Sequence, residues 1–270
     1  MKLVAATILV IGSVVSQSEG VAPPRPADAL VARSAAGVVP REHHKGVAEA
    51  GGATSEPTHK VVSEAPYDVP RLTIARLQYD GGGDWYANPS SLPNLLTAIR
   101  ARTTLQVERA EARVTLMSPE LHDYPFVHMT GHGNVRFSDA EVPRLRAYLE
   151  RGGFLHADDN YGLDESFRRE IARVFPDRPL RKVPLSHPVY NIVYPFPRGL
   201  PKIHEHDGKP PQGVGIFLGD RLVVFYSHES DLGNGWEDRS VHGTSPGLHE
   251  AALRMGVNLF VYAMTSRSGH

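Results

Sequence analysis

Two apolar runs that each end in a polar turn constrain the fold of this chain most strongly. Residues 126–130 lead into the turn 131–134, which reads Gly-His-Gly-Asn, and residues 153–157 lead into the turn 158–162, which reads Asp-Asp-Asn-Tyr-Gly. A helical pattern lies between the two runs. The order strand, turn, helix, strand, turn, helix predicts an α/β domain with a mostly parallel sheet and helices on both faces. Because sites form where neighbouring parallel strands end, the two turns also predict a functional site.

The remaining segments fit the same class of fold. Ser138 and Glu141 form a capping-box pattern at the start of the intervening helix, and Gly152 stands where a helix commonly ends. Residues 212–217 and 221–226 predict a hairpin. Further predicted elements are strands at 72–79, 105–107 and 180–183 and helices at 91–99, 163–174 and 246–263.

Charge and composition exclude several classes of function. The formal net charge of the 270 residues is -1, so no overall basic field exists to hold nucleic acid or an anionic membrane surface. The sequence contains no cysteine. Disulfides, thiolate metal ligands and a cysteine nucleophile are therefore excluded.

The first 70 residues predict an exported protein. A basic start and an apolar run at 3–15 precede small residues, so 1–18 is interpreted as a signal peptide, with an uncleaved anchor or a mistaken start site as the alternatives. The run is short for a membrane span of about 20 residues, so no span is expected once the signal is removed. Residues 19–70 read as a disordered linker, 71–266 as the α/β domain and 267–270 as a tail. The expected location is periplasmic or extracellular.

The two polar turns supply most of the candidate site residues. His132 is a candidate catalytic residue, and the backbone and side chains of Gly131, Gly133 and Asn134 would contact a ligand. After the second run, Asp158 and Asp159 could bind a cation, act as a general base or cap the next turn. The neighbouring candidate ligand-binding residues are Asn160 and Tyr161.

Three other segments add candidates. Asp84 and Trp85 follow the first predicted strand and either face a ligand or belong to a plain surface loop. His204 and His206 have a spacing that suits a metal ion, together with Asp158, although a solvated loop is the alternative. At the end of the hairpin, His228 is a candidate base and Glu229 a candidate ligand-binding residue, although adjacent side chains seldom touch.

The chain also resembles a bacterial family of exported proteins called domain of unknown function 4159. The resemblance covers about residues 71–265. It rests on the motifs at 76–85, 129–138, 152–167, 201–213 and 227–233. The family name implies no activity.

A more distant resemblance is to class I glutamine amidotransferase-like domains, including the trehalose-utilisation type. Thr130-Gly131-His132-Gly133 looks like their Gly-His-Gly turn, and residues 152–159 look like their nucleophile turn. His187-Pro188 and residues 219–227 look like the late trehalose-utilisation segments. This resemblance implies a flavodoxin-like sheet and, by fold analogy, carbohydrate chemistry. Because aspartate stands near the place of the missing cysteine, glutaminase activity is not expected.

Three functions remain open at this point. The first is a metal-assisted hydrolase or carbohydrate-related enzyme, with a divalent metal ion as its expected cofactor. The second is a non-catalytic module that binds a small polar ligand such as a carbohydrate through the rings of Trp85, Tyr161 and Trp236. The third is an interaction domain in an envelope assembly, whose protein partners the sequence does not identify.

Overall fold

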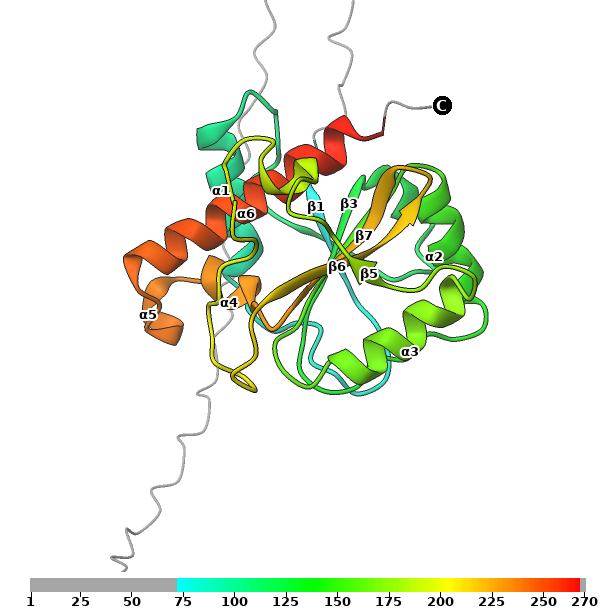
Figure 1. Ribbon diagram of the computed structural model, residues 1–270. Helices are drawn as coiled ribbons and strands as arrows, with labels where there is room; N and C mark the ends of the chain where they lie inside the picture. Colours follow the sequence, from blue (N-terminus) through cyan, green and yellow to red (C-terminus); the bar gives the residue numbers. More distant parts are fainter. Residues whose placement is uncertain (1–71, 268–270) are drawn as a thin grey trace, which may run out of the picture. The chain divides into compact units, whose positions relative to one another are not determined.

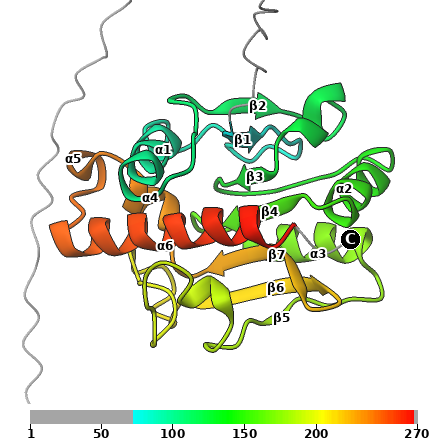
Figure 2. The ribbon, with the colours of Figure 1, turned by 90° about the horizontal axis from the view of Figure 1, so that it is seen from above.

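The computed structural model describes residues 72–267, which contain a seven-stranded sheet of order β2-β1-β3-β4-β7-β6-β5 (Figures 1 and 2). From β2 to β7 in this order the strands are parallel, whereas β6 is antiparallel to β7 and β5 is antiparallel to β6. The predicted α/β class with a mostly parallel sheet is therefore confirmed. The strands are β1 (Ile74–Leu77), β2 (Ala112–Val114), β3 (Phe126–Met129), β4 (Phe154–Asp158), β5 (Arg181–Lys182), β6 (Gln212–Leu218) and β7 (Arg221–His228).

Helices lie on both sides of the sheet. Helices α2 and α3 cover one face, and α1 and α6 cover the other (Figure 1). The longer helices are α1 (Ser91–Arg102), α2 (Glu141–Glu150), α3 (Asp164–Val174) and α6 (Pro246–Thr265). The short ones are η1 (Pro119–Asp123), η2 (Pro188–Tyr190), α4 (Leu232–Trp236) and α5 (Arg239–His242).

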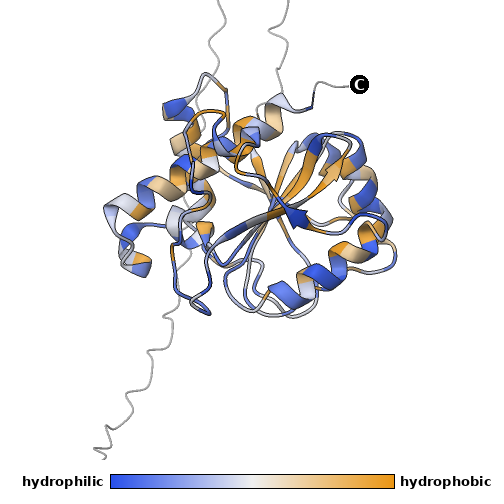
Figure 3. Ribbon diagram, viewed as in Figure 1, coloured by the Kyte–Doolittle hydropathy of each residue, from blue (hydrophilic) through white to orange (hydrophobic). Residues whose placement is uncertain are grey.

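Alternation along the central strands divides the core into two layers. Phe126 and Phe154 point toward α1 and α6, whereas Val127 and Leu155, one residue later, point toward α2 and α3. Both faces are covered, so every residue of β3 and β4 is buried and each strand reads as a mainly apolar run. Figure 3 shows the apolar residues gathered along the strands.

Two predicted strands are placed differently. The strand predicted at 105–107 is β2, at Ala112–Val114, and Val107 forms only an isolated bridge with Leu72. Val114 is the one buried residue of β2, so this edge strand has no apolar run that a sequence pattern could detect. The strand predicted at 180–183 is reduced to β5, whose two residues are exposed.

The capping box at the start of α2 is confirmed. Ser138 N donates to Glu141 Oε2 at 2.8 Å, and Glu141 N donates to Ser138 Oγ at 3.3 Å. This reciprocal pair fixes the point where the loop after β3 enters the helix.

The predicted signal peptide at 1–18 and linker at 19–70 lie outside the described residues, as does most of the tail. Among residues 72–267, no helix is both long enough and apolar enough to cross a membrane.

Candidate functional site

Four loops meet where the parallel strands end, and we call this region the carboxyl edge. They follow β1 (residues 78–90), β3 (130–137), β4 (159–163) and β7 (229–231). Three of them approach one another at glycine residues. A Cβ atom built on Gly133 would lie 3.9 Å from Gly83 Cα, and one built on Gly162 would lie 3.7 Å from Gly133 N. The backbone of Gly83, Gly133 and Gly162, which carries no side chains, therefore forms the surface between these loops, and we call this surface the glycine floor.

His132 and Asp84 form a pair at this floor. His132 Nδ1 lies 3.0 Å from Asp84 Oδ2, and the backbone N–H of His132 donates a short hydrogen bond to Asp84 Oδ1. About half of the His132 side chain is exposed. Because Asp84 is acidic, the Nδ1–H tautomer suits this contact and leaves Nε2 as a free acceptor. The structure thus joins two residues that the sequence predicted separately.

The turn that carries His132 is braced from behind. Tyr79 Oη donates to Thr130 O at 3.0 Å, and burial, with a smaller contribution from Asp84, raises the pKa of Tyr79. Gly131 has φ of 145° and no room for a side chain, because a Cβ atom would collide with the Tyr79 hydroxyl. Its role is conformational.

Asn134 braces the same turn from the other side. Its Nδ2 donates to Gly81 O at 3.1 Å, and its Oδ1 accepts from Arg169 Nη2 at 3.1 Å. Both polar atoms of the amide are therefore engaged, which makes Asn134 a support for the loop.

Asp158 has a different position from the one that a catalytic or metal-binding role requires. Its side chain is fully buried and accepts a short hydrogen bond from Ser227 Oγ. It also accepts from Leu232 N at 3.0 Å and from Gly233 N at 2.6 Å, at the start of α4. Of the three roles that the sequence left open, capping fits Asp158. Its carboxylate caps the first residues of α4, which follows the neighbouring strand β7.

Asp159 and Asn160 hold the shape of the loop after β4. Asp159 Oδ1 accepts from Tyr161 N at 3.1 Å, and Asn160 Oδ1 accepts from Asn88 Nδ2 at 3.2 Å. Asp159 Oδ2 also lies 3.9 Å from His228 Nε2. Asp159 thus combines a local turn contact with a distant histidine contact.

Tyr161 presents its ring to solvent from this loop. Its φ is 92° and its side chain is exposed. The ring stacks on His206 with the ring centroids 5.2 Å apart.

The predicted metal ligands do not gather around one point. Asp231, and not Asp158, lies beside the two histidines, with its Oδ2 3.1 Å from His204 Nδ1 and 3.4 Å from His206 Nε2. No group of three or more His, Asp or Glu side chains in the described part of the chain is arranged to hold a metal ion. The expected set of His204, His206 and Asp158 is therefore not assembled.

Asp231 and His206 influence each other's protonation. Burial by itself raises the pKa of Asp231, but contacts from His204 and His206 outweigh it and lower that pKa below its ordinary value. The contact with Asp231 raises the pKa of His206, which burial would lower. This is a second histidine–carboxylate group at the carboxyl edge.

His228 and Glu229 face different partners, as expected for adjacent residues. His228 Nε2 lies 3.5 Å from Asp164 Oδ1. Glu229 is buried and pairs with Lys202, whose Nζ lies 2.7 Å from Glu229 Oε2. A direct pair between His228 and Glu229 is not formed.

The two tryptophans differ in access. Trp85 is partly buried against the α2 and α3 core and makes an edge contact with Tyr86, with centroids 5.6 Å apart. Trp236 is fully buried, so the predicted role of its ring in binding a ligand is wrong. The five residues of α4 have no apolar period, so their sequence does not indicate that Trp236 packs into the core.

Strained backbone collects at the carboxyl edge. Among residues 72–267, four residues other than glycine have positive φ: Asn88, Tyr161, Glu229 and Asp231. All four lie in the loops that follow β1, β4 and β7. Such conformations cost about 1–3 kcal/mol each and cluster at functional sites.

Sequence reasoning missed two groups of residues near the site. Asp231 lies in the polar segment after β7, but His228 and Glu229 were chosen from that segment. His128 and His156 each follow a phenylalanine by two residues, and the parallel register places them side by side. That repeated spacing was the available signal.

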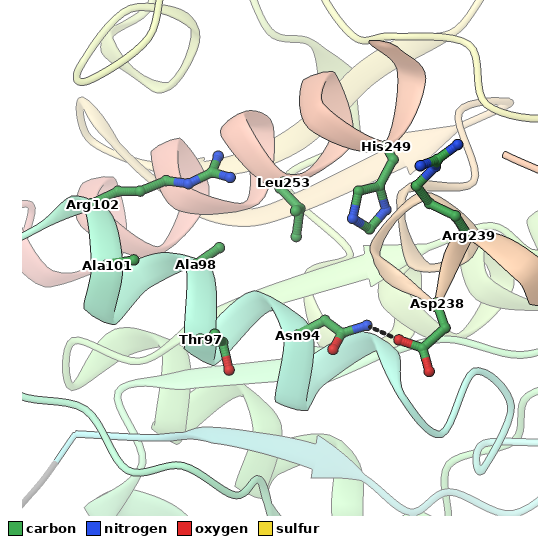
Figure 4. Close-up of a pocket in the computed structure, with 9 residues that line it drawn as sticks. All are labelled: Asn94, Thr97, Ala98, Ala101, Arg102, Asp238, Arg239, His249 and Leu253. Carbon is green, nitrogen blue, oxygen red and sulfur yellow. Dashed lines mark hydrogen bonds between the residues drawn. The ribbon is translucent and has the colours of Figure 1, made fainter. Parts of the chain in front are cut away.

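Two hollows on the surface are lined by residues other than His132 and His206. One of about 420 Å³ lies between α1 and α6, with Ala98, Ala101 and Leu253 among its lining residues (Figure 4). Another of about 690 Å³ runs from Asn134 along α3 to Arg173. Neither includes His132 or His206.

Comparison with known proteins gives a family match. Residues 73–264 match the family described as Domain of unknown function (DUF4159). No curated protein matches the chain.

Proposed function

The chain belongs to the DUF4159 family, and because that name assigns no activity, we propose a function from the residues of the carboxyl edge. We propose that the domain is a hydrolase for a small polar ligand of carbohydrate type, with His132 as its general base. The observation that carries this proposal is the contact of 3.0 Å between His132 Nδ1 and Asp84 Oδ2, which leaves Nε2 on the open side of the ring.

The Asp84–His132 pair has the parts of an acid–base catalyst. Asp84 orients the imidazole and would stabilise the positive charge that forms when His132 Nε2 accepts a proton. With no cysteine in the chain, the nucleophile in this proposal is water. His132 would remove a proton from that water as it attacks the ligand, and would return the proton to the leaving group.

The glycine floor supplies a place for developing negative charge. The N–H group of Gly133 has no acceptor among the described residues, and Gly83 and Gly162 leave backbone space around it. A backbone donor of this kind can stabilise an oxyanion without reorganising when charge develops. Gly133 would therefore act through its N–H group and not through a side chain.

The aromatic ring of Tyr161 favours a carbohydrate over other small polar ligands. Sugar rings present an apolar face and a polar rim, which suits an exposed ring beside hydrogen-bonding groups. The strained φ of 92° at Tyr161 is maintained by the hydrogen bond from its N–H to Asp159. Asp159 would then position the ring, and the His206–Asp231 contact would extend the site.

We also propose a finer assignment of the fold. The order β2-β1-β3-β4-β7 supports a flavodoxin-like, amidotransferase-like arrangement, in which ligands bind at the carboxyl ends of the strands. The aspartates near the place of the nucleophile are engaged in hydrogen bonds, which supports a reaction that uses water. We also propose that residues 1–18 direct export to the periplasm or the exterior.

A hydrolase screen on glycosides and sugar esters tests the proposal. We expect His132→Asn and Asp84→Asn to lower kcat by about 10²–10⁴-fold, the usual contribution of a general base. His122→Asn is the matched control, because His122 is exposed on η1, and it should retain the wild-type rate. Equal rates for all three variants would overturn the assignment of His132. A near-stoichiometric divalent ion in the active protein, found by metal analysis, would instead favour a metal-assisted reaction.

A non-catalytic binding module is the second candidate. The observation that favours it is the burial of Asp158, which removes the carboxylate expected to work beside His132. Calorimetry with sugars separates the two candidates. Sugar binding that depends on Tyr161 but survives His132→Asn, with no turnover of any substrate, would support the binding module.

A further inference from the structure

A chain of four side chains crosses the core beneath the carboxyl edge, and we call His128, His156, Ser227 and Asp158 the buried chain. All four are fully buried. His128 Nδ1 lies 3.1 Å from His156 Nδ1, and His156 Nε2 lies 2.9 Å from Ser227 Oγ. Ser227 Oγ then donates a short hydrogen bond to Asp158 Oδ1. The buried chain therefore links β3, β4 and β7 to the start of α4.

The proton positions in the buried chain can be assigned in turn, starting from Asp158. An ionised Asp158 only accepts, so Ser227 donates to it and must accept from His156 Nε2–H. His156 Nδ1 is then bare and accepts from His128 Nδ1–H. Each histidine carries one proton, and His128 Nε2 is left as a buried nitrogen without a hydrogen-bond partner.

A second arrangement reverses the donor in each of the three hydrogen bonds of the buried chain, and Ser227 Oγ then no longer donates to Ala157 O, which lies 3.2 Å away. If one proton is added at His128 Nε2, the proton in each hydrogen bond can cross to the other atom. His156 gains the proton at Nδ1 and gives its Nε2 proton to Ser227, which gives its own proton to Asp158. Both histidines are again neutral, and the only net change is one proton on Asp158.

We propose that the buried chain is a proton relay, in which protonation of Asp158 exchanges the tautomers of His156 and His128. The unpartnered His128 Nε2 is one end of the relay, and the carboxylate at the start of α4 is the other. This inference does not depend on the hydrolase proposal.

The surroundings keep the histidines neutral and let the carboxyl group titrate. Burial lowers the pKa of His156 to about 3. Burial, then His156 and then Arg76 lower the pKa of His128. Burial, followed by the nearby charge of Asp231, raises the pKa of Asp158 to about 7.

Two charged residues and one aromatic residue surround the relay. Arg76 on β1 acts on His128, and Asp231, just before α4, acts on Asp158. Trp236 on α4 packs against both imidazoles, with its centroid 5.4 Å from that of His128 and 5.5 Å from that of His156.

The relay connects protonation to the loop before α4. Asp158 Oδ1 accepts from both Ser227 Oγ and Leu232 N. When Oδ1 carries a proton and donates to Ser227, it becomes a weaker acceptor for Leu232 N–H, because that bond loses its charge. The segment that carries Asp231 would then be held less firmly at low pH.

Nitrogen NMR of the full chain tests the relay. Uniform ¹⁵N and ¹³C labelling distinguishes Nδ1–H from Nε2–H in each imidazole and reports the Asp158 carboxyl carbon, and titration from about pH 5.5 to about pH 8.5 covers the range around neutrality. We expect His156 to change from Nδ1–H to Nε2–H as the pH rises, and His128 to change from Nε2–H to Nδ1–H at the same midpoint. Both rings should stay neutral throughout.

Two variants give the test its controls. Ser227→Ala removes the link, so the carboxyl carbon of Asp158 should still titrate while the two histidines no longer respond. Asp158→Asn should fix one pair of tautomers at every pH. His122 is exposed and outside the buried chain, so its response should be the same in all proteins.

Two results would overturn the relay. The first is that His128 and His156 keep the same tautomers across the whole titration of the wild-type protein, a result that needs no variant to fold. The second is that they still exchange tautomers in Ser227→Ala.

Discussion

Gly131 is the residue at which backbone shape most directly controls the candidate site. It combines φ of 145° with a Cβ direction that meets the Tyr79 hydroxyl and lies 3.0 Å from Asp84 Oδ1. We predict that Gly131→Ala lowers the free energy of unfolding by about 2–4 kcal/mol, since backbone strain of about 1–3 kcal/mol is joined by a collision. Urea denaturation measures the change.

Gly82→Ala is the matched control for this prediction. Gly82 also has positive φ, at 91°, but a Cβ atom there would meet nothing within 4 Å. It should show the strain alone, and therefore a smaller loss than Gly131→Ala. Equal losses would mean that the collision with Tyr79 and Asp84 does not matter.

Candidate site residues could be predicted from the sequence where they lie in an exposed turn. The prediction was poorer where the side chain is buried. His132 and Asp84 were both predicted, because polar groups after apolar runs mark strand ends. Asp158 follows the same rule, yet it is buried against α4. Its partner helix has five residues and no apolar period, so no local pattern predicts that an N–H group will reach that carboxylate.

Between elements, a largely buried ion pair joins β1 to the segment before β2, and its arginine also contacts the first site loop. Arg76 Nε lies 2.8 Å from Glu111 Oε1, and Arg76 Nη1 donates to Ala87 O at 2.7 Å. We predict that Arg76→Met lowers the free energy of unfolding by about 3–5 kcal/mol, because the Glu111 carboxylate, whose side chain is only 12% exposed, loses its closest partner. Thermal or urea unfolding measures this loss.

Arg113, which also lies near the Glu111 carboxylate, provides a control for the Arg76–Glu111 contact. Arg113 Nε lies 3.7 Å from Glu111 Oε1, but 69% of the Arg113 side chain is exposed. Arg113→Met should change stability by less than about 1 kcal/mol, as is usual for exposed ion pairs. The double variant Arg76→Met with Glu111→Leu should recover part of the loss. A cost for Arg113→Met as large as that for Arg76→Met would contradict this account.

Element positions were predictable in proportion to their burial. β3 and β4 are covered on both faces and read as apolar runs, whereas β2 and β5 lie at the two edges of the sheet and were misplaced or overextended. The contacts of Arg76 join residues far apart in sequence. An arginine in an apolar strand gives no indication of which carboxylate will neutralise it.

For the whole molecule, Asp158 links stability to pH. The folded protein holds the Asp158 proton up to a pKa of about 7, whereas the unfolded chain releases it near the ordinary value of 3.8. Between these values the folded state binds more protons, so this contribution to stability is lost as the pH rises. Relative to Asp158→Asn, the wild type should lose about 1 kcal/mol per pH unit between about pH 5 and about pH 7, with little change above.

Unfolding at a series of pH values measures this difference. Asp177→Asn is the control, because the Asp177 side chain is 57% exposed. Its difference from the wild type should not vary over the same range. A constant difference between the wild type and Asp158→Asn would mean that Asp158 titrates alike in the folded and unfolded chain.

At this scale the sequence predicted the class of fold, and it indicated that polar loops meet at the carboxyl edge, but it did not indicate which of their side chains are buried and which face solvent. Alternating strands and helices fix a parallel sheet, and a parallel sheet brings strand ends together. Which polar groups then turn outward depends on contacts between loops, such as the Asp231 contacts with His204 and His206. Those contacts form only after the sheet is assembled.

Chemical-shift mapping on the full, isotope-labelled chain tests the central claim, that the carboxyl edge binds a small polar ligand. Neutral mono- and oligosaccharides would be added singly, and backbone amide shifts followed. The account predicts shifts in residues 131–134 and 159–162, weakened in the Tyr161→Leu variant. Shifts confined to the hollow between α1 and α6, or no shift with any sugar, would contradict it.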